Sequence, residues 1–286
     1  MRLPTRLLRR KPDSHKGDYG HVFVVAGSAR FSGAAVLCAE AALASGAGLV
    51  TLGIPRSLNS AIIRIKPKEV MTLPLAETKD AALSRTAYAA IAAFAQKADV
   101  VALGPGLSQE KQTQQLVRRI IAGVHRDMVI DADGLNALAG HLDLLAKARK
   151  GLRALVLTPH PGEMARLTGS TAACVQKDRK KVAKNFACRY NVVLVLKGHT
   201  TVVADSKSLY SNMTGNPGMA KAGSGDVLTG MIASFMGQGL SAFEAAKYGA
   251  YLHGCAGDLA AKKKTQLGMR ASDIIGMLPE AIRRSS

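Results

Sequence analysis

Short runs of β-branched and other apolar residues alternate with longer alanine-rich segments along most of the chain. Strands are predicted at 21–27, 49–54, 100–104 and 192–198, strands that end in polar loops at 128–134 and 154–163, and a hairpin at 200–205 and 208–212. Helices are predicted at 33–45, 81–95, 109–122, 171–190 and over most of the chain after residue 212. Continuously apolar strands separated by helices are typical of a parallel sheet covered on both faces. The pattern predicts a doubly wound, mostly parallel α/β fold, with residues 1–286 as one domain.

Polar signatures follow directly after four of the predicted strands. They are Gly-Pro-Gly at 104–106, Asp-Ala-Asp-Gly at 131–134, Thr-Pro-His-Pro-Gly-Glu at 158–163 and Lys-Gly-His-Thr-Thr at 197–201. Doubly wound sheets bind their ligands at the carboxyl ends of their strands. The coincidence predicts a ligand site along one edge of the sheet.

The composition is that of a globular protein with an excess of basic side chains. Hydrophobic residues make up 48% and charged residues 21% of the 286 positions, which excludes a disordered, collagen-like or coiled-coil chain. Lys and Arg number 39 against 20 Asp and Glu, a formal charge of +19. This charge favours anionic partners, such as nucleic acid, a membrane surface or phosphorylated small molecules. Aromatics at 4% and the lack of Trp disfavour a nucleic-acid partner, because base-stacking surfaces need them.

The cysteines and one long uncharged stretch bear on the compartment. The four cysteines have neither zinc-site nor disulfide-framework spacing, so we expect reduced residues that mostly serve packing: Cys38, Cys174, Cys188 and Cys255. Segment 34–54 is nearly uncharged, but Glu40 and a Gly-Ala-Gly break favour a buried helix and strand over a membrane span. Residues 1–20 lack the apolar core of a signal peptide. We expect a cytoplasmic protein with no membrane partner.

The segment Ala-Gly-Ser-Gly-Asp-Val-Leu-Thr-Gly at 222–230 is the strongest candidate for chemistry. Gly223 and Gly225 allow successive backbone N–H groups to face one space at the start of a predicted helix, where the helix dipole favours an anion. Asp226 falls in the first turn, where a carboxylate can take the proton of a hydroxyl that attacks a phosphoryl group. A plain helix cap explains Asp226 equally well on spacing alone. The chain has no P-loop motif.

The other strand-end motifs each admit a functional and a structural interpretation. Gly106 ends a stiff Gly-Pro-Gly turn that allows a ligand to approach the backbone closely. His160 lies between two prolines, where a lone histidine is more often a structural hydrogen-bonding residue, and Glu163 suits a helix cap better than catalysis. Lys197 is suited to meet phosphates, but a simple hairpin entry explains it equally well.

Asp131 and Asp133 could support magnesium through water, or equally serve as turn and N-cap residues. The chain has no HExxH, no EF-hand loop and no Cys/His cluster, so we expect no tightly bound transition metal and no metal-ligand residues. Segment 17–35 has several glycines but no GxGxxG, and no dinucleotide-binding fold is inferred from it. Three basic runs are predicted to be solvated helix faces or tails, at 9–11, 179–181 and 262–264.

Taken together, these motifs resemble the ADP/ATP-dependent NAD(P)H-hydrate dehydratases of the ribokinase-like superfamily. The resemblance covers nearly the whole chain, and TPHPGE together with GNPGMAKAGSGD makes it specific. The segments that carry it are KGDYGHVFVVAGS, SGAAVLCAEAALASGAGLVT, LGPGL, DADGLN, LTPHPGE, VLKG, GNPGMAKAGSGDVLTG and YLHG. It implies a ribokinase-like fold and a lyase that restores NADH and NADPH whose nicotinamide ring is hydrated at C6. The co-substrate would be ADP or ATP with Mg²⁺; with ADP, which we favour, AMP and phosphate are released.

The resemblance also implies roles for individual residues. Asp226 would take the hydroxyl proton, and the backbone of Gly223, Ser224 and Gly225 would form the anion hole with it. The adenine nucleotide would contact Lys197, Gly198, His199, Thr200, Thr201 and Gly225. The hydrated cofactor would contact Asp226, Gly106, His160 and Ala35 or the adjoining Ala34, and Asn216 would help order the phosphate loop.

The resemblance further implies a homo-oligomer, with a tetramer expected. Many bacterial members carry an N-terminal epimerase domain. About twenty residues precede the first matching motif here, so we expect that domain to be absent and a separate epimerase, or spontaneous interconversion, to supply the reactive epimer.

Two other functions compete with this hypothesis. A superfamily kinase acting on a hydroxymethylpyrimidine or a hydroxyethylthiazole would share the Gly-Ser-Gly-Asp chemistry but release a stable phosphoester. A non-catalytic nucleotide- or nucleic-acid-binding protein would fit the charge and would bind with a steep salt dependence.

Overall fold

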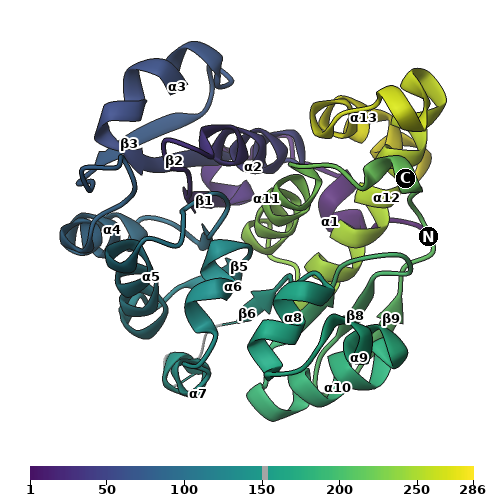
Figure 1. Cartoon of the computed structure of the whole chain (residues 1–286). Coiled ribbons are helices and arrows are strands. Elements are labelled where there is room, and N and C mark those ends of the chain that lie inside the picture. Colours follow the sequence, from purple (N-terminus) through teal and green to yellow (C-terminus); the bar gives the residue numbers. More distant parts are fainter. Residues whose placement is uncertain (150–153) are drawn as a thin grey trace.

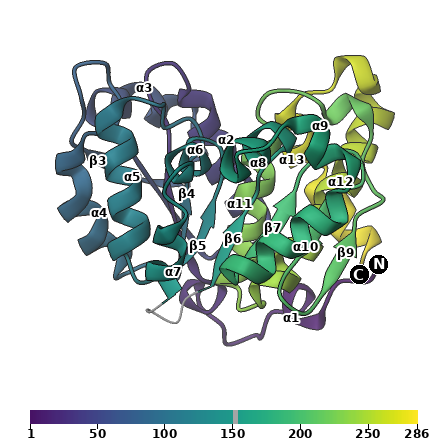
Figure 2. The same ribbon diagram turned by 60° about the horizontal axis from the view of Figure 1, so that its bottom comes forward.

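A nine-stranded sheet forms the centre of the molecule (Figures 1 and 2). The computed structural model describes residues 1–149 and 154–286. Among these residues the strands lie in the order β3-β2-β1-β4-β5-β6-β7-β8-β9. They are β1 (His21–Val25), β2 (Leu49–Pro55), β3 (Met71–Leu75), β4 (Val100–Leu103), β5 (Asp127–Ile130), β6 (Leu155–Leu157), β7 (Val193–Leu196), β8 (Val202–Ala204) and β9 (Leu209–Ser211).

Strands β1 to β7 run parallel, and β8 and β9 add an antiparallel edge. The predicted hairpin is confirmed, with Val203 opposite Tyr210. The strand order changes direction between β1 and β4, which makes this the switch point of a doubly wound sheet. The fold class predicted from the sequence is therefore confirmed.

Strand β3 was not expected from the sequence pattern. It contains Pro74, which cannot donate to a ladder, and Met71 is exposed. Proline is tolerated on an edge strand, where one side of the backbone needs no partner. Because β3 pairs only with β2, the edge of the sheet accommodates a segment that reads poorly as a strand.

Helices cover both faces of the sheet, as the continuous apolar strands predict (Figures 1 and 2). Side chains alternate between the faces: Val24 belongs to the core cluster that includes residues of α2, α11, α12 and α13, and Val25 belongs to the cluster that includes residues of α4, α5, α8 and α10. The α-helices are α1 (Thr5–Leu8), α2 (Ser32–Ala44), α3 (Asn59–Ile65), α4 (Tyr88–Ala95), α5 (Lys111–Gly123), α6 (Asp133–Leu138), α7 (Asp143–Arg149), α8 (Pro161–Thr168), α9 (Ala172–Lys177), α10 (Arg179–Tyr190), α11 (Ser224–Gly237), α12 (Ala242–Gly268) and α13 (Ala271–Arg284). Short 3-10 turns are η1 (Lys16–Tyr19), η2 (Arg56–Leu58), η3 (Arg85–Ala87) and η4 (Pro217–Met219).

Local chemistry corrects several predicted boundaries. The helix predicted at 81–95 begins only at Tyr88, because Ala81 has a positive φ of 49° and a 3-10 turn precedes the helix. The helix predicted at 171–190 is divided at Asp178, whose carboxylate accepts the N–H of Lys181 and starts α10. The polar segments after β5 and β6 are not loops throughout, since α6 and α8 begin within them.

The prediction for the cysteines is corrected in part, and the prediction for the uncharged stretch 34–54 is confirmed. All four cysteines are free thiols, but Cys174 and Cys188 are exposed, so the packing role is wrong for these two. The uncharged stretch 34–54 forms α2 and β2, as predicted. Within the described part of the chain, no helix combines the length and apolarity needed to cross a membrane.

Candidate active site

The sequence motifs meet at the carboxyl edge of the sheet. Strands β4, β5, β6 and β7 are parallel neighbours, so the residues that follow them converge: Gly106, Asp131, His160 and Lys197. Helix α11 packs against β1, β4 and β5 and brings its N-terminus to the same edge. A methyl group added at Gly225 would lie 3.1 Å from Lys197 Nζ and 3.7 Å from Asp131 Oδ2. The sheet thus assembles one site from segments far apart in the sequence.

The N-terminus of α11 is open. Its N-cap, Gly223, has a φ of 92°, and an added Cβ would lie 2.6 Å from Leu37 Cδ1, so only glycine fits. The N–H of Ser224 donates to Lys221, but within the described residues the N–H groups of Gly225 and Asp226 have no acceptor. Two unpaired donors and the positive end of the helix dipole suit a bound anion.

Asp226 lies in the first turn of this helix without capping it. The pKa of its carboxyl is raised to about 7, chiefly by burial and next by repulsion from Asp131, while Lys197 opposes the rise. Glu163 and Asp133 add smaller repulsions. A carboxylate with a pKa near neutrality can accept a proton from a substrate hydroxyl at physiological pH. Asp226 makes no capping hydrogen bond, so the capping interpretation is wrong, and the role of Asp226 as a base stays a prediction.

A buried ion pair lies beside Asp226. Asp131 Oδ1 accepts from Lys197 Nζ at 2.6 Å, and its Oδ2 accepts from Thr229 Oγ1 at 2.8 Å. Lys197 Nζ is also 3.8 Å from Glu163 Oε2. Burial alone would lower the pKa of Lys197, but attraction by Asp131 and Glu163 raises it overall, so the ammonium stays charged.

The aspartates of the Asp-Ala-Asp-Gly motif are held by hydrogen bonds to other parts of the protein. Both oxygens of Asp131 are taken by Lys197 and Thr229. Asp133 accepts from the N–H of Ser108 at 2.8 Å and from Asn136 Nδ2 at 3.0 Å. No group of three or more acidic, His or Cys side chains suited to a metal occurs among the described residues. Both aspartates thus make structural hydrogen bonds, but neither is the N-cap of α6, which is Ala132, so the N-cap role is wrong.

His160 and Glu163 close the N-terminus of α8. His160 Nδ1 accepts from the N–H groups of Gly162 and Glu163 at 3.0 and 3.2 Å. The Glu163 carboxylate reaches back to the N–H of His160 at 2.8 Å, which completes a capping box. The predicted cap at Glu163 is confirmed, and the imidazole of His160 stays exposed, with Nε2 3.4 Å from Glu163 Oε1.

The segment predicted to contact the nucleotide forms the connection from β7 to β8. Gly198 and His199 are exposed, and Thr200 and Thr201 are half-buried. Arg179 holds this connection, because its guanidinium donates to the carbonyls of Leu196 at 2.8 Å and Lys197 at 3.2 Å. The prediction that the run 179–181 is simply solvated is therefore wrong at its first residue.

The turn after β4 lies against the start of α2. Ser28 Oγ donates to the carbonyl of Gly106, and a Cβ at Gly106 would lie 2.6 Å from the Phe31 carbonyl oxygen and 3.1 Å from Ala34 Cβ. Ala35 is fully buried, whereas Ala34 faces the turn. Of the two alanines considered for substrate contact, Ala34 is the one beside Gly106.

Sequence reasoning missed His253 on α12. Its Nε2 lies 3.4 Å from Ser224 Oγ, and burial lowers the pKa of the imidazole to about 4, so it is neutral at pH 7. It therefore braces the first residue of α11. Asn216 accepts from the N–H of Gly218 and donates to Asp258, and its expected role in ordering the phosphate loop stays a prediction. The tetrapeptide Tyr-Leu-His-Gly was the available signal for His253.

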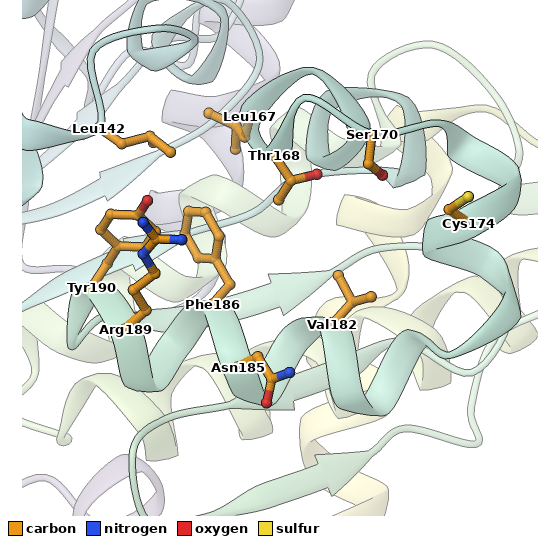
Figure 3. Close-up of a pocket in the computed structure, with 10 residues that line it drawn as sticks. All are labelled: Leu142, Leu167, Thr168, Ser170, Cys174, Val182, Asn185, Phe186, Arg189 and Tyr190. Carbon is orange, nitrogen blue, oxygen red and sulfur yellow. The ribbon is translucent and has the colours of Figure 1, made fainter.

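A separate cavity of about 350 Å³ lies between the end of α8, α9 and α10 (Figure 3). Phe186 and Tyr190 project into it from α10, with Arg189 beside them. None of the site residues predicted from the sequence lines it. The candidate residues from the sequence are therefore gathered at the carboxyl edge of the sheet and not in this cavity.

Comparisons with known proteins agree on one family. A family sequence model described as NAD(P)H-hydrate dehydratase matches residues 22–280. The bifunctional NAD(P)H-hydrate repair enzyme of Moorella thermoacetica is 49% identical over 280 residues, covering 98% of this chain and 52% of that protein. The ADP-dependent (S)-NAD(P)H-hydrate dehydratase of Neisseria meningitidis is 39% identical, covering 99% of this chain and 90% of that protein. The chain spans about half the length of the bifunctional relatives and most of the dehydratase.

Solved structures agree with the sequence relatives. The ADP/ATP-dependent NAD(P)H-hydrate dehydratase of Bacillus subtilis, co-crystallised with ATP and Mg²⁺, matches with a TM-score of 0.80 and 30% identity over 100% of this chain and 95% of that chain. The hydroxyethylthiazole kinase of Pyrococcus horikoshii, at 14% identity, 93% and 88% coverage and a TM-score of 0.62, shares the fold alone. The chain has a ribokinase-like fold and belongs to the NAD(P)H-hydrate dehydratase family.

Proposed function

We propose that this protein uses an adenine nucleotide, preferably ADP, to dehydrate the S epimer of hydrated NADH or NADPH. The observation that carries the proposal is the open N-terminus of α11, where the free N–H groups of Gly225 and Asp226 lie beside a carboxylate whose pKa is about 7. An anion site next to a general base is what phosphoryl transfer to a hydroxyl requires. Family membership supports the identity of the substrate.

The reaction has two steps. Asp226 removes the proton of the C6 hydroxyl as its oxygen attacks the terminal phosphorus of the nucleotide, and AMP leaves when that nucleotide is ADP. The C6–O bond of the resulting phosphoester then breaks, phosphate departs and the ring loses the proton at C5, which restores the double bond. The N–H groups at the start of α11 hold the phosphoryl oxygens as charge develops on them.

The surrounding motifs take the two substrates. Residues 197–201 are proposed to contact the adenine nucleotide, since Lys197 carries the positive charge nearest the α11 N-terminus. Gly106, Ala34 and His160 are proposed to contact the hydrated cofactor. Magnesium would enter as the nucleotide complex and neutralise phosphate charge.

We also propose the assembly, the partner enzyme and the compartment of this protein. Residues 1–286 would act as one catalytic unit in a homotetramer, with a separate epimerase supplying the S epimer. The cytoplasm is the proposed compartment, because its reducing conditions keep free cysteines such as the exposed Cys174 and Cys188 as thiols. Sedimentation velocity tests the assembly.

A spectroscopic assay tests the function. Hydrated NADH is mixed with protein, Mg²⁺ and either ADP or ATP, and the near-UV absorbance of the dihydronicotinamide is followed. We expect nucleotide-dependent recovery that stops when only the R epimer remains, and faster recovery with ADP. Folded protein that gives no recovery with either nucleotide would overturn the proposal, and a stable phosphoester formed from a hydroxymethylpyrimidine or hydroxyethylthiazole would replace it with a kinase.

A further inference from the structure

Asp131 connects three elements of the site without facing solvent. It follows β5, its side chain is 1% exposed, and its two oxygens accept from Lys197 after β7 and from Thr229 on α11. Thr229 lies three residues after Asp226, so the two side chains share one face of α11. The hydrogen bond to Thr229 therefore sets the position from which α11 presents Asp226.

The same carboxylate holds the ammonium group next to Asp226. The charged or titratable groups that act on Asp226 are Asp131 after β5, Asp133 on α6, Glu163 on α8, Lys197 after β7 and, from α2, the protonated thiol of Cys38. Among these groups Lys197 is the only cation. Its Nζ lies 2.6 Å from Asp131 and 3.8 Å from Glu163. Without Asp131, this ammonium would be the natural ion-pair partner of Asp226, and an ion-paired carboxylate is a weaker base.

We propose that Asp131 is a positioning residue for the dehydration. By holding Lys197 and Thr229, it keeps the Asp226 carboxylate free of an ion pair and directed toward the open N-terminus of α11. The inference rests on the proposed function for its catalytic meaning, while the underlying electrostatics belong to the protein whatever its substrate. Asp131 is 1% exposed and both of its oxygens accept from the protein, so we infer that it acts through Lys197 and Thr229.

The Asp131→Asn variant tests this role through the pH dependence of kcat/KM. Asparagine keeps the size of the side chain and an acceptor for Lys197, but it removes the charge. We expect the acid limb of the profile to move to lower pH by about one unit or more, with a lower plateau because Asp226 becomes a weaker base.

Thr229→Val is the matched control. It removes the other hydrogen bond of Asp131 but leaves the charges of Asp131 and Lys197 in place. We expect its plateau to fall and its acid limb to stay where it is in the wild type. If Asp131→Asn also lowers turnover without moving the acid limb, Asp131 is only structural and the proposal is overturned.

A second measurement does not depend on activity. The unfolding midpoint of each protein is recorded from pH 5 to 8 with and without Asp226→Asn, in the wild type and in the Asp131→Asn background. In the wild-type background the rise in unfolding midpoint caused by Asp226→Asn should grow up to about pH 7, and in the Asp131→Asn background that growth should be smaller and end at a lower pH. Equal growth in both backgrounds overturns the inference. An inactive wild type with the expected stability pattern would instead overturn only the proposed function.

Discussion

Helices α8 and α11 begin at the same edge of the sheet with nearly the same pattern of residues. In each, a glycine occupies the second helical position and an acid the third: Gly162 and Glu163 in α8, Gly225 and Asp226 in α11. The N-cap differs. In α8 it is a histidine whose ring accepts two helix N–H groups, and Glu163 reaches back to complete the cap. In α11 it is Gly223, which has no side chain to accept anything.

The N-cap residue decides whether the N-terminus of a helix is available to a ligand. The N–H groups at the start of α8 donate to the His160 ring, so among the described residues this helix end borders the site without a free donor. In α11 the N–H groups of Gly225 and Asp226 stay free within the described chain, and the carboxylate of Asp226 is not used up in a cap. One N-cap residue thus separates a closed end from an anion site with a base beside it.

Removing the base should have the largest effect. Asp226→Asn keeps the anion site but deletes the proton acceptor, so we expect turnover to fall by about 10²–10⁴-fold while nucleotide affinity changes little. Stopped-flow absorbance measures turnover, and calorimetry measures nucleotide binding. Retention of near wild-type turnover would contradict the role of Asp226.

The Gly223→Ala substitution, which adds a side chain at the N-cap of α11, should have the next largest effect. At Gly223 an alanine combines the positive φ of 92° with a contact of 2.6 Å to Leu37, so we expect a loss of about 1–3 kcal/mol in the free energy of unfolding. Nucleotide affinity should fall with it, because the N–H groups shift. Gly162→Ala is the control in α8: its added Cβ would meet only the His160 ring, at 3.0 Å. Equal losses in the free energy of unfolding for the two variants, measured by denaturant unfolding, would contradict this difference between the two helix ends.

The raised pKa of Asp226 predicts two pH effects. The base must be ionised, so kcat/KM should rise with pH and at pH 6 reach about a tenth of its plateau, given a pKa of about 7. The folded pKa exceeds the ordinary 3.8, so stability falls as pH rises between these values. Asp226→Asn should therefore be more stable than the wild type at pH 8, by about 1–3 kcal/mol. Equal unfolding midpoints at pH 8, or a kcat/KM that falls as pH rises from 6 to 7, would contradict this.

Opening α8 should have the smallest effect. His160→Ala removes a cap, which costs about 1 kcal/mol of stability. Because His160 follows β6 at the carboxyl edge of the sheet, we also expect the affinity for the hydrated cofactor to fall more than the affinity for the nucleotide. Calorimetry with each ligand separately checks this, and equal weakening of both would indicate that His160 acts only as a cap.

The sequence predicts most of the sheet because each central strand is a continuous apolar run, which needs a parallel, doubly covered position. It does not predict β3, where Pro74 masks a strand that the sheet edge tolerates. Helix ends are missed where a local feature decides them, such as the positive φ of Ala81 or the cap at Asp178.

The candidate site was predictable to the extent that its residues follow strands or start helices. Gly225, Asp226 and Lys197 could be placed in this way. The pairing of Asp131 with Thr229 joins residues 98 positions apart, and no local pattern encodes such a contact. The same holds for His253 beside Ser224. These contacts exist only after the sheet has brought the segments together.

The central claim is that the open end of α11, and not the closed end of α8, binds the terminal phosphate of the nucleotide. Amide chemical shifts test it directly when ADP is titrated into isotope-labelled protein in the absence of hydrated cofactor. We expect large chemical-shift changes for the N–H groups of Gly225 and Asp226 and small ones for those of Gly162 and Glu163. Large shifts at Gly162 and Glu163, with Gly225 and Asp226 unchanged, would contradict it.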